Sequence, residues 1–220
     1  MIDLRKGDCL KVMKGIPDGS IDAIITDPPY GTTACKWDSV IDFDLMWEQL
    51  NRIIKPNGAI VLFGGEPFSS ALRMSNVKNY KYDWIWVKNR VTGQMLAKRQ
   101  PLRKYENIHV FYKKQCVYNR QMTLRTAEEF KKNYRKESAK VNSKSEHYTS
   151  KLTRLSYERQ MYNPPTNILE FKKDNKRNGK SHPTQKPVSL MEYLIKTYTN
   201  ENETVLDFTM GSGSTGVAAK

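Results

Sequence analysis

Cysteine is scarce in this sequence, and its spacing argues against two kinds of site. The 220 residues include three cysteines and three histidines, which show no metal-ligand spacing, and the cysteines lie far apart. A zinc site and a disulfide framework are therefore disfavoured, and a reducing, cytoplasmic setting is expected. Apolar runs long enough to span a bilayer are absent, as is a secretory signal pattern, so no membrane partner is expected.

Basic residues outnumber acidic residues, and most of the excess lies in one segment of the chain. The chain has 37 Lys/Arg against 23 Asp/Glu, which gives a formal net charge of +14. Residues 113–181 hold 18 of these cations and seven of the acids, a surplus of 11. Tyrosines punctuate the same block, and aromatic rings among cations suit nucleic acid. A phosphate-binding surface is the favoured interpretation, and a solvated insertion is the alternative.

Apolar patterning predicts strands that alternate with helices. Strands are expected at residues 2–9, 21–27, 59–64, 82–88, 107–113 and 203–208. Helices are expected at residues 43–54, 67–75 and 186–199, where apolar side chains recur at helical spacing. This alternation indicates an α/β fold, a doubly wound and mostly parallel sheet covered on both faces, with a basic insertion.

The second predicted strand ends in an unusual corner. It runs directly into Asp27, Pro28, Pro29 and Tyr30, and two prolines cannot donate to a sheet ladder. The corner therefore lies at the carboxyl end of a strand, where open α/β sheets bind ligands. An ordinary strand-end turn with a packed ring is the alternative.

A glycine-rich turn follows the last predicted strand. Asp207 and Phe208 precede Gly211 and Gly213, and glycines let a ligand approach the backbone closely. No Gly-Lys-Ser/Thr follows, which excludes a P-loop. A tight turn onto a helix is the alternative. Because this loop, the corner and the loop at Asp8 all follow predicted strands, we expect them to share one edge of the sheet.

Three segments resemble a known family. TDPPYG, HPTQKPVSLMEYLI and VLDFTMGSGSTG are similar to the signatures of S-adenosylmethionine-dependent DNA amino-methyltransferases, which methylate adenine N6 or cytosine N4. Their order resembles the circularly permuted beta group. The resemblance implies a Rossmann-like domain with a catalytic half at 1–112 and a cofactor-binding half at 181–220. The basic block at 113–180 lies where the family keeps its target-recognition region.

The resemblance also implies a role for each residue of the corner. The Asp27 carboxylate and the Pro28 carbonyl accept the two N–H groups of a base amine, while Pro29 stiffens the turn. Tyr30 offers a face on which the base can stack. Since a base inside a duplex cannot reach such a pocket, it must be flipped out of double-stranded DNA.

For the cofactor S-adenosylmethionine, the resemblance implies a set of binding residues. Asp8 meets the adenine amino group, and Lys186 faces the carboxylate of the cofactor. The full set is Asp8, His182, Thr184, Lys186, Asp207, Phe208, Gly211 and Gly213. For Lys186, simple solvation at the start of a helix is the alternative.

One departure from the family pattern concerns the end of the sequence. The family continues through a helix into another strand, whereas this sequence stops at Lys220, inside that helix. We therefore expect a sheet that lacks one strand, weak cofactor binding, and completion by further chain, a dimer partner or another polypeptide.

The target base is less sharply indicated than the reaction. Adenine N6 is preferred because Asp-Pro-Pro-Tyr resembles the adenine-specific members, and cytosine N4 is the alternative. Two other classes stay open, a methyltransferase of RNA or protein and an inactive DNA-binding fragment.

Overall fold

The computed structural model describes residues 2–33, 35, 38–126, 162–172 and 185–220. The chain forms two compact units, Met1–Asn119 with Thr166–Lys220, and Arg120–Pro165. In the described part of the smaller unit, β5 (Thr123–Leu124) pairs antiparallel with β6 (Tyr162–Asn163). No described helix is both long and apolar enough to cross a membrane.

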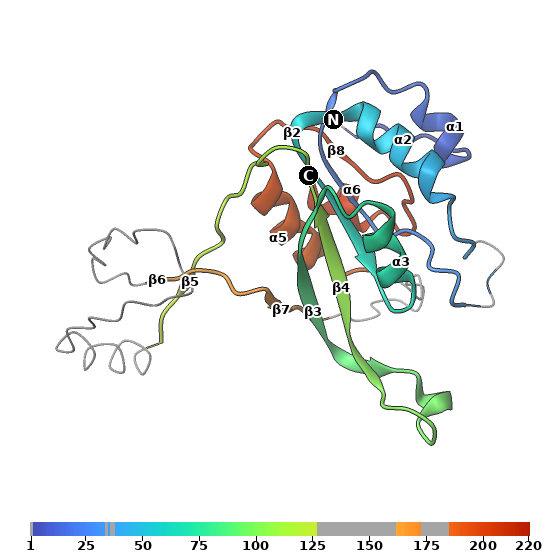
Figure 1. The fold of residues 1–220 in the computed structure, drawn as a ribbon. Coiled ribbons are helices and arrows are strands. Elements are labelled where there is room, and N and C mark those ends of the chain that lie inside the picture. The colour runs from blue at the N-terminus through green and yellow to red at the C-terminus, as the bar shows by residue number, and fades with distance from the viewer. Residues whose placement is uncertain (1, 34, 36–37, 127–161, 173–184) are drawn as a thin grey trace, which may run out of the picture. The chain divides into compact units, whose positions relative to one another are not determined.

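The larger unit is built on a six-stranded sheet of order β7-β3-β4-β2-β1-β8 (Figure 1). The strands are β1 (Ile21–Thr26), β2 (Ile54–Gly64), β3 (Tyr80–Thr92), β4 (Arg103–Phe111), β7 (Ile168–Glu170) and β8 (Val205–Leu206). β1 runs parallel to β2 and β8, and β3 runs parallel to β7. Only β4 pairs antiparallel within this sheet, with both β2 and β3. The predicted α/β class with a mostly parallel sheet is confirmed.

Helices cover both faces of this sheet (Figure 1). They are α1 (Cys9–Met13), α2 (Phe43–Ile53), α3 (Phe68–Ser75), α5 (Val188–Tyr198), α6 (Ser214–Ala218) and a 3₁₀ turn, η1 (Gln94–Leu96). Alternate residues of β1 point to opposite faces, so Ile24 joins the core beneath α2 and α3. Ile25 joins the second core, with Leu190 and Leu194 of α5. Burial on both faces explains the continuous apolar run of this strand.

One predicted strand is wrong. Residues 2–6 have no regular structure and are exposed, and Asp8 instead begins α1. The Asp8 carboxylate accepts a hydrogen bond from the Lys11 backbone N–H at 3.1 Å, which caps the helix. In the described chain no strand pairs with residues 2–6, and an unpaired segment has no ladder to hold it extended.

Two further features were not predicted. β7 lies within the range assigned to the basic insertion, yet it pairs with β3 in the main sheet. Within the same range, residues 113–119 and 166–172 belong to the larger unit. The target-recognition role of residues 113–180 stays a prediction.

Candidate active site

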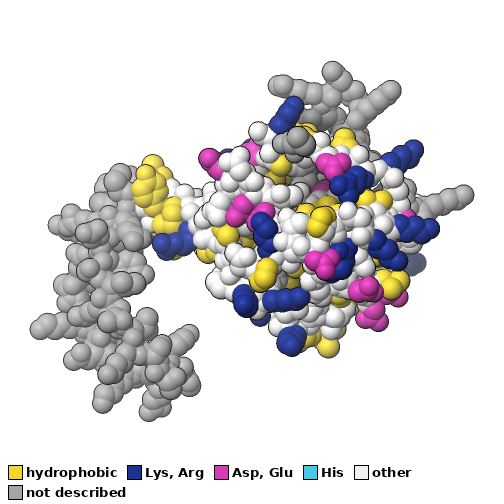
Figure 2. Space-filling model, turned by 90° about the horizontal axis from the view of Figure 1, so that it is seen from above, with side chains coloured by type: hydrophobic (Ala, Val, Ile, Leu, Met, Phe, Trp, Pro, Cys, Tyr) yellow, Lys and Arg dark blue, Asp and Glu magenta, His cyan; other side chains and the backbone are white. Residues whose placement is uncertain are grey.

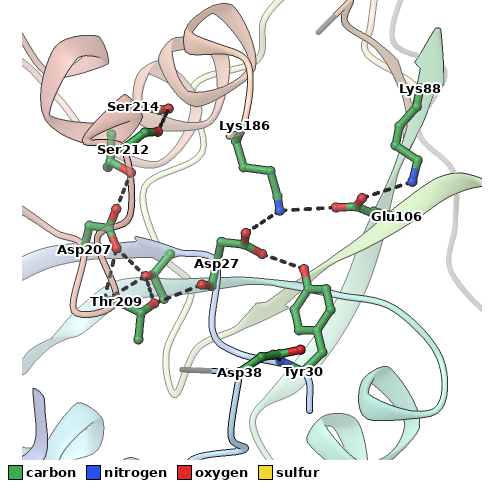
Figure 3. Close-up of polar contacts among 12 residues, drawn as sticks. Asp27, Tyr30, Asp38, Lys88, Glu106, Lys186, Asp207, Thr209, Ser212 and Ser214 are labelled. Atoms are coloured by element: carbon green, nitrogen blue, oxygen red, sulfur yellow. Dashed lines mark hydrogen bonds and ion pairs between the residues drawn. The ribbon is translucent and has the colours of Figure 1, made fainter. Parts of the chain in front are cut away.

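Asp27 lies directly after β1, at the carboxyl end of the strand. Its carboxylate has two partners, Lys186 and Tyr30, and Figure 3 shows Lys186 above it and Tyr30 below. The Tyr30 hydroxyl donates to Oδ1 at 2.6 Å, and the Lys186 ammonium pairs with Oδ2. The side chain is 25% exposed, so it still reaches solvent although both of its oxygens have a partner in the protein. An ionised carboxylate has about four acceptor positions, which leaves capacity for a ligand N–H.

Lys186 belongs to a chain of alternating charges, in which the two lysines are buried and the two carboxylates are partly buried (Figure 3). Its Nζ lies 3.3 Å from Oε2 of Glu106, and Oε1 of Glu106 lies 3.1 Å from Nζ of Lys88. Burial acts to lower the pKa of Lys186, but Asp27 and Glu106 outweigh it and raise that pKa above its ordinary value. Burial likewise acts to raise the pKa of Glu106, but Lys186 and Lys88 lower it. Both groups are therefore charged at neutral pH.

Tyr30 is held as a hydrogen-bond donor. Burial and the neighbouring Asp27 carboxylate raise the pKa of its hydroxyl well above the ordinary value, so the proton stays on oxygen. The ring stacks on Phe68 with centroids 5.0 Å apart and planes at 27°. The Lys186 ammonium lies 5.9 Å from the Tyr30 ring centroid. The ring thus packs against α3 while its hydroxyl points to Asp27.

Asp38 fixes the backbone that follows the corner. Its two carboxylate oxygens accept four backbone N–H groups, at 2.7–3.0 Å, from Tyr30, Gly31, Thr32 and Thr33. Burial acts to raise the pKa of Asp38, but hydrogen bonds from the Thr33 side chain and from the backbone of this loop lower it. This residue was not predicted, although a carboxylate a few residues after a turn is a common loop acceptor.

The glycine-rich loop is joined to the same corner. The Thr209 hydroxyl donates to the backbone carbonyl of Asp27 at 3.1 Å and lies 2.6 Å from the Thr26 hydroxyl. Asp207 accepts from the hydroxyls of Thr26 and Thr215 and from the Thr209 backbone N–H. Burial raises the pKa of Asp207 despite these donors. The expectation of a shared sheet edge is met for these two loops, whereas the loop at Asp8 does not follow a strand.

The other residues predicted to bind the cofactor have different positions in the structure. Phe208 is 9% exposed and packs into the core beneath α2, and Asp8 caps α1. Gly211 is exposed, and Gly213 has a φ of +80°, a conformation that favours glycine. His182 and Thr184 lie outside the described residues. The cofactor roles of all eight residues stay predictions.

Several site residues were missed by sequence reasoning. Glu106 and Lys88 come from β4 and β3, and Thr209 follows Phe208. Both strands contain several other polar and charged residues, so their sequences do not single out Glu106 and Lys88. The pairing of Glu106 with Lys186, 80 positions away, and with Lys88 on the neighbouring strand was not visible in the sequence.

Comparisons with known proteins identify the family of this chain. A family model for N6/N4 methyltransferases, described as DNA methylase, matches residues 21–220. Type II methyltransferase M.HpaI of Haemophilus parainfluenzae is 27% identical over 97% of the chain and 65% of its own length. M.HinfI of Haemophilus influenzae is also 27% identical, over 99% of the chain and 61% of its own length. The chain thus spans less than two thirds of the length of these two relatives.

A solved structure is similar over nearly all of the chain. The crystal structure of the M1.HpyAVI–SAM complex superposes with a TM-score of 0.58 and 26% identity, covering 99% of this chain and 88% of that one. The family match extends from β1 to the end of α6, and so includes both the Asp27 corner and the glycine-rich loop. The chain belongs to the N6/N4 DNA methylase family.

Proposed function

We propose that this protein transfers a methyl group from S-adenosylmethionine to the exocyclic amino group of a base in double-stranded DNA. The observation that carries the proposal is the junction of two loops at one sheet edge. A carboxylate and two prolines form one side, and an exposed glycine-rich backbone, joined through Thr209, forms the other. Family membership and the net charge of +14 support the same activity.

The amino group of a base is a poor nucleophile because its lone pair is delocalised into the ring. In the proposed mechanism, the Asp27 carboxylate accepts one amino N–H and the Pro28 carbonyl accepts the other. Two fixed acceptors favour a pyramidal nitrogen with its lone pair free to attack. Lys186 and the Tyr30 hydroxyl hold the carboxylate in place, so little reorientation is needed when the base arrives.

Tyr30 has a second proposed role, as a stacking surface for the extruded base. Phe68 stacks on the Tyr30 ring, so the base would use the face of the ring away from Phe68. A base has to leave the duplex to reach this corner, which costs a few kcal/mol of unstacking. Residues 113–180 are proposed to recognise the target sequence.

S-adenosylmethionine, when bound, supplies an electrophilic methyl group on a sulfonium sulfur. The residues fit such a ligand at the loop of Gly211 and Ser212, because both are exposed and Met210 beside them is 45% exposed. Gly211 and Gly213 are proposed to line it. Asp207 shapes this loop, since its oxygens already accept from Thr26, Thr209 and Thr215.

Adenine N6 is the proposed target, because the Asp-Pro-Pro-Tyr corner resembles adenine-specific members of the family. Cytosine N4 is the alternative, since the two amines are geometrically alike. Sequencing with modified-base detection on DNA from cells that express the protein reads out the base and the site together. Mass spectrometry of the nucleosides separates N6-methyladenine from N4-methylcytosine, and the absence of both would refute the proposal.

Asp27→Ala tests the catalytic assignment. We expect methyl incorporation into DNA to fall by about 100-fold or more, because one of the two acceptors is lost. DNA affinity should stay close to that of the wild type. Asp44→Ala, an exposed carboxylate in the first turn of α2, is the matched control. Near wild-type activity of Asp27→Ala would overturn the mechanism.

A further inference from the structure

The hairpin formed by β3 and β4 extends past the end of β2. β2 and β4 pair only up to Gly64 and Asn107, whereas β3 and β4 continue to the pair Thr92 and Arg103. Figure 1 shows the two strands and their loop projecting beyond the sheet. Every residue from 92 to 105 is exposed. We call residues 90–104 the hairpin tip.

All charged residues of the hairpin tip are cations. It carries five cations and no Asp or Glu, and all five are exposed: Arg90, Lys98, Arg99, Arg103 and Lys104. Within the described chain, none of them forms an ion pair. By contrast, the face in Figure 2 carries Lys/Arg and Asp/Glu side chains interspersed, as on an ordinary solvated surface. A projecting element with one sign of charge fits a polyanion such as the DNA backbone.

An apolar side chain lies at the same place. Met95 in η1 is 100% exposed and Leu96 is 44% exposed. The turn around them is ordered by its own backbone bonds, including Leu96 N–H to Gly93 carbonyl at 2.9 Å and Arg99 N–H to Leu96 carbonyl at 2.8 Å. Gly93 has a φ of +91°, which a residue with a side chain rarely adopts. A preformed turn thus presents a methionine among cations.

The hairpin tip rises from the candidate site itself. Glu106, which contacts Lys186, pairs with Trp86, and Lys88 lies two residues further along β3. At about 3.3 Å per residue, Arg103 lies roughly 10 Å beyond Glu106 along the strand. The major groove is about 8.5 Å deep, so the tip has the reach to enter a groove while a base occupies the Asp27 corner.

We propose that the hairpin tip contacts the DNA duplex beside the extruded base. Its cations bind phosphates, and Met95 inserts as an apolar wedge at the step from which the base has left. Methionine is among the side chains that proteins insert between base steps. This inference rests on the proposed function and adds a DNA contact outside the predicted recognition region at 113–180.

The charge part is tested with Lys98→Gln/Arg99→Gln in the full chain. Binding to a short mixed-sequence duplex is measured by fluorescence anisotropy at several salt concentrations. We expect affinity to fall about tenfold at low salt, and the slope of log K against log salt to shrink by roughly two. Lys78→Gln/Lys81→Gln is the matched control, because it removes two exposed cations near the opposite end of β3. An unchanged slope in the tip variant overturns the phosphate contact.

The wedge part is tested with Met95→Ala, and Met74→Ala on α3 is the control, since Met74 is 73% exposed. A duplex with 2-aminopurine at the target base, once sequencing has identified the site, reports extrusion as a rise in fluorescence. We expect this rise to fall several-fold in Met95→Ala and not in Met74→Ala. An equal rise in fluorescence in both variants overturns the proposed insertion of Met95. A wild type that neither binds nor methylates DNA would refute the proposed function instead.

Discussion

Lys186→Met removes the central cation of the charge chain and keeps much of the side-chain volume. In the wild type, the ammonium lies between the Asp27 and Glu106 carboxylates, and the Lys186 side chain is 9% exposed. The variant leaves both carboxylates in place with one neighbour each, Tyr30 and Lys88 respectively. We expect a loss of both stability and activity, because each partly buried carboxylate loses a cationic partner.

The magnitude follows from the distances. At 3.3 Å and an effective dielectric of about 20, the Lys186–Glu106 attraction is about 5 kcal/mol. Removing the ammonium also relieves its own desolvation cost, so the net loss is smaller. Breaking one partner of a buried pair typically costs about 3–5 kcal/mol, and we expect about 3 kcal/mol in the free energy of unfolding.

The pH dependence of this loss can be derived from the pKa shifts. The lowered pKa of Glu106 contributes stability above the unfolded pKa of about 4.3, and this is lost as pH falls through the folded value. The raised pKa of Lys186 contributes stability below its unfolded pKa of about 10.4, and this is lost as pH rises through the folded value. The difference between wild type and variant should therefore be largest near pH 7 and shrink below about pH 4.

The assay is urea denaturation at several pH values, with S-adenosylmethionine affinity measured by calorimetry alongside. Lys196→Met, an exposed lysine in the last turn of α5, is the control and should change stability by less than about 0.5 kcal/mol. If Lys186 positions Asp27, kcat falls while cofactor affinity stays close to that of the wild type. If Lys186 faces the cofactor carboxylate, affinity falls as well. A stability loss below about 1 kcal/mol at pH 7 would refute the charge-chain reasoning.

Two further variants probe the backbone around the corner. Asp38→Asn replaces a carboxylate that accepts four N–H groups with an amide that has one acceptor oxygen, and denaturation at pH 7 should show a loss of about 3 kcal/mol. Because the pKa of Asp38 is lowered, this loss should narrow below about pH 4, and a pH-independent loss would contradict it. Thr209→Val removes the donor to the Asp27 carbonyl, so kcat should fall about tenfold, and an unchanged kcat would show that this bond does not position the corner.

Elements with strong periodicity could be predicted from the sequence. α2 begins where expected, because the Asp42 carboxylate accepts from the Leu45 N–H at 3.0 Å and the apolar face is continuous. β1 ends at Thr26, since prolines at 28 and 29 have no N–H to donate. These elements follow from local chemistry, which one sequence contains in full.

The charge chain could not be predicted, because its members are distant in the sequence. Lys186 lies 159 positions from Asp27, and only the pairing of β3 with β4 brings Lys88 to Glu106. The first predicted strand failed for a related reason. Residues 2–9 have a strand-like composition, but a strand forms only where another strand lies beside it.

A buried group of side chains can have the geometry of a catalytic site without being one. Ser69 Oγ lies 2.9 Å from His109 Nε2, and His109 Nδ1 lies 2.7 Å from Asp83 Oδ1, the order of a hydrolytic triad. Ser69 and His109 are both 0% exposed, so no substrate reaches the hydroxyl. The three residues instead join α3, β3 and β4. Burial therefore assigns this cluster to structure, whereas the proposed catalytic residue Asp27 is 25% exposed.

The contacts of Asp27 explain why both halves of the larger unit are needed at one corner. The Asp27 side chain is held by Lys186, and its carbonyl is held by Thr209, so two residues from the C-terminal half fix one residue of the N-terminal half. β8, which precedes Thr209, pairs with β1, which precedes Asp27, so the sheet itself sets their separation. An acceptor whose side chain and carbonyl are held from different elements has little freedom to turn away. That rigidity is what a reaction depending on the direction of two hydrogen bonds requires.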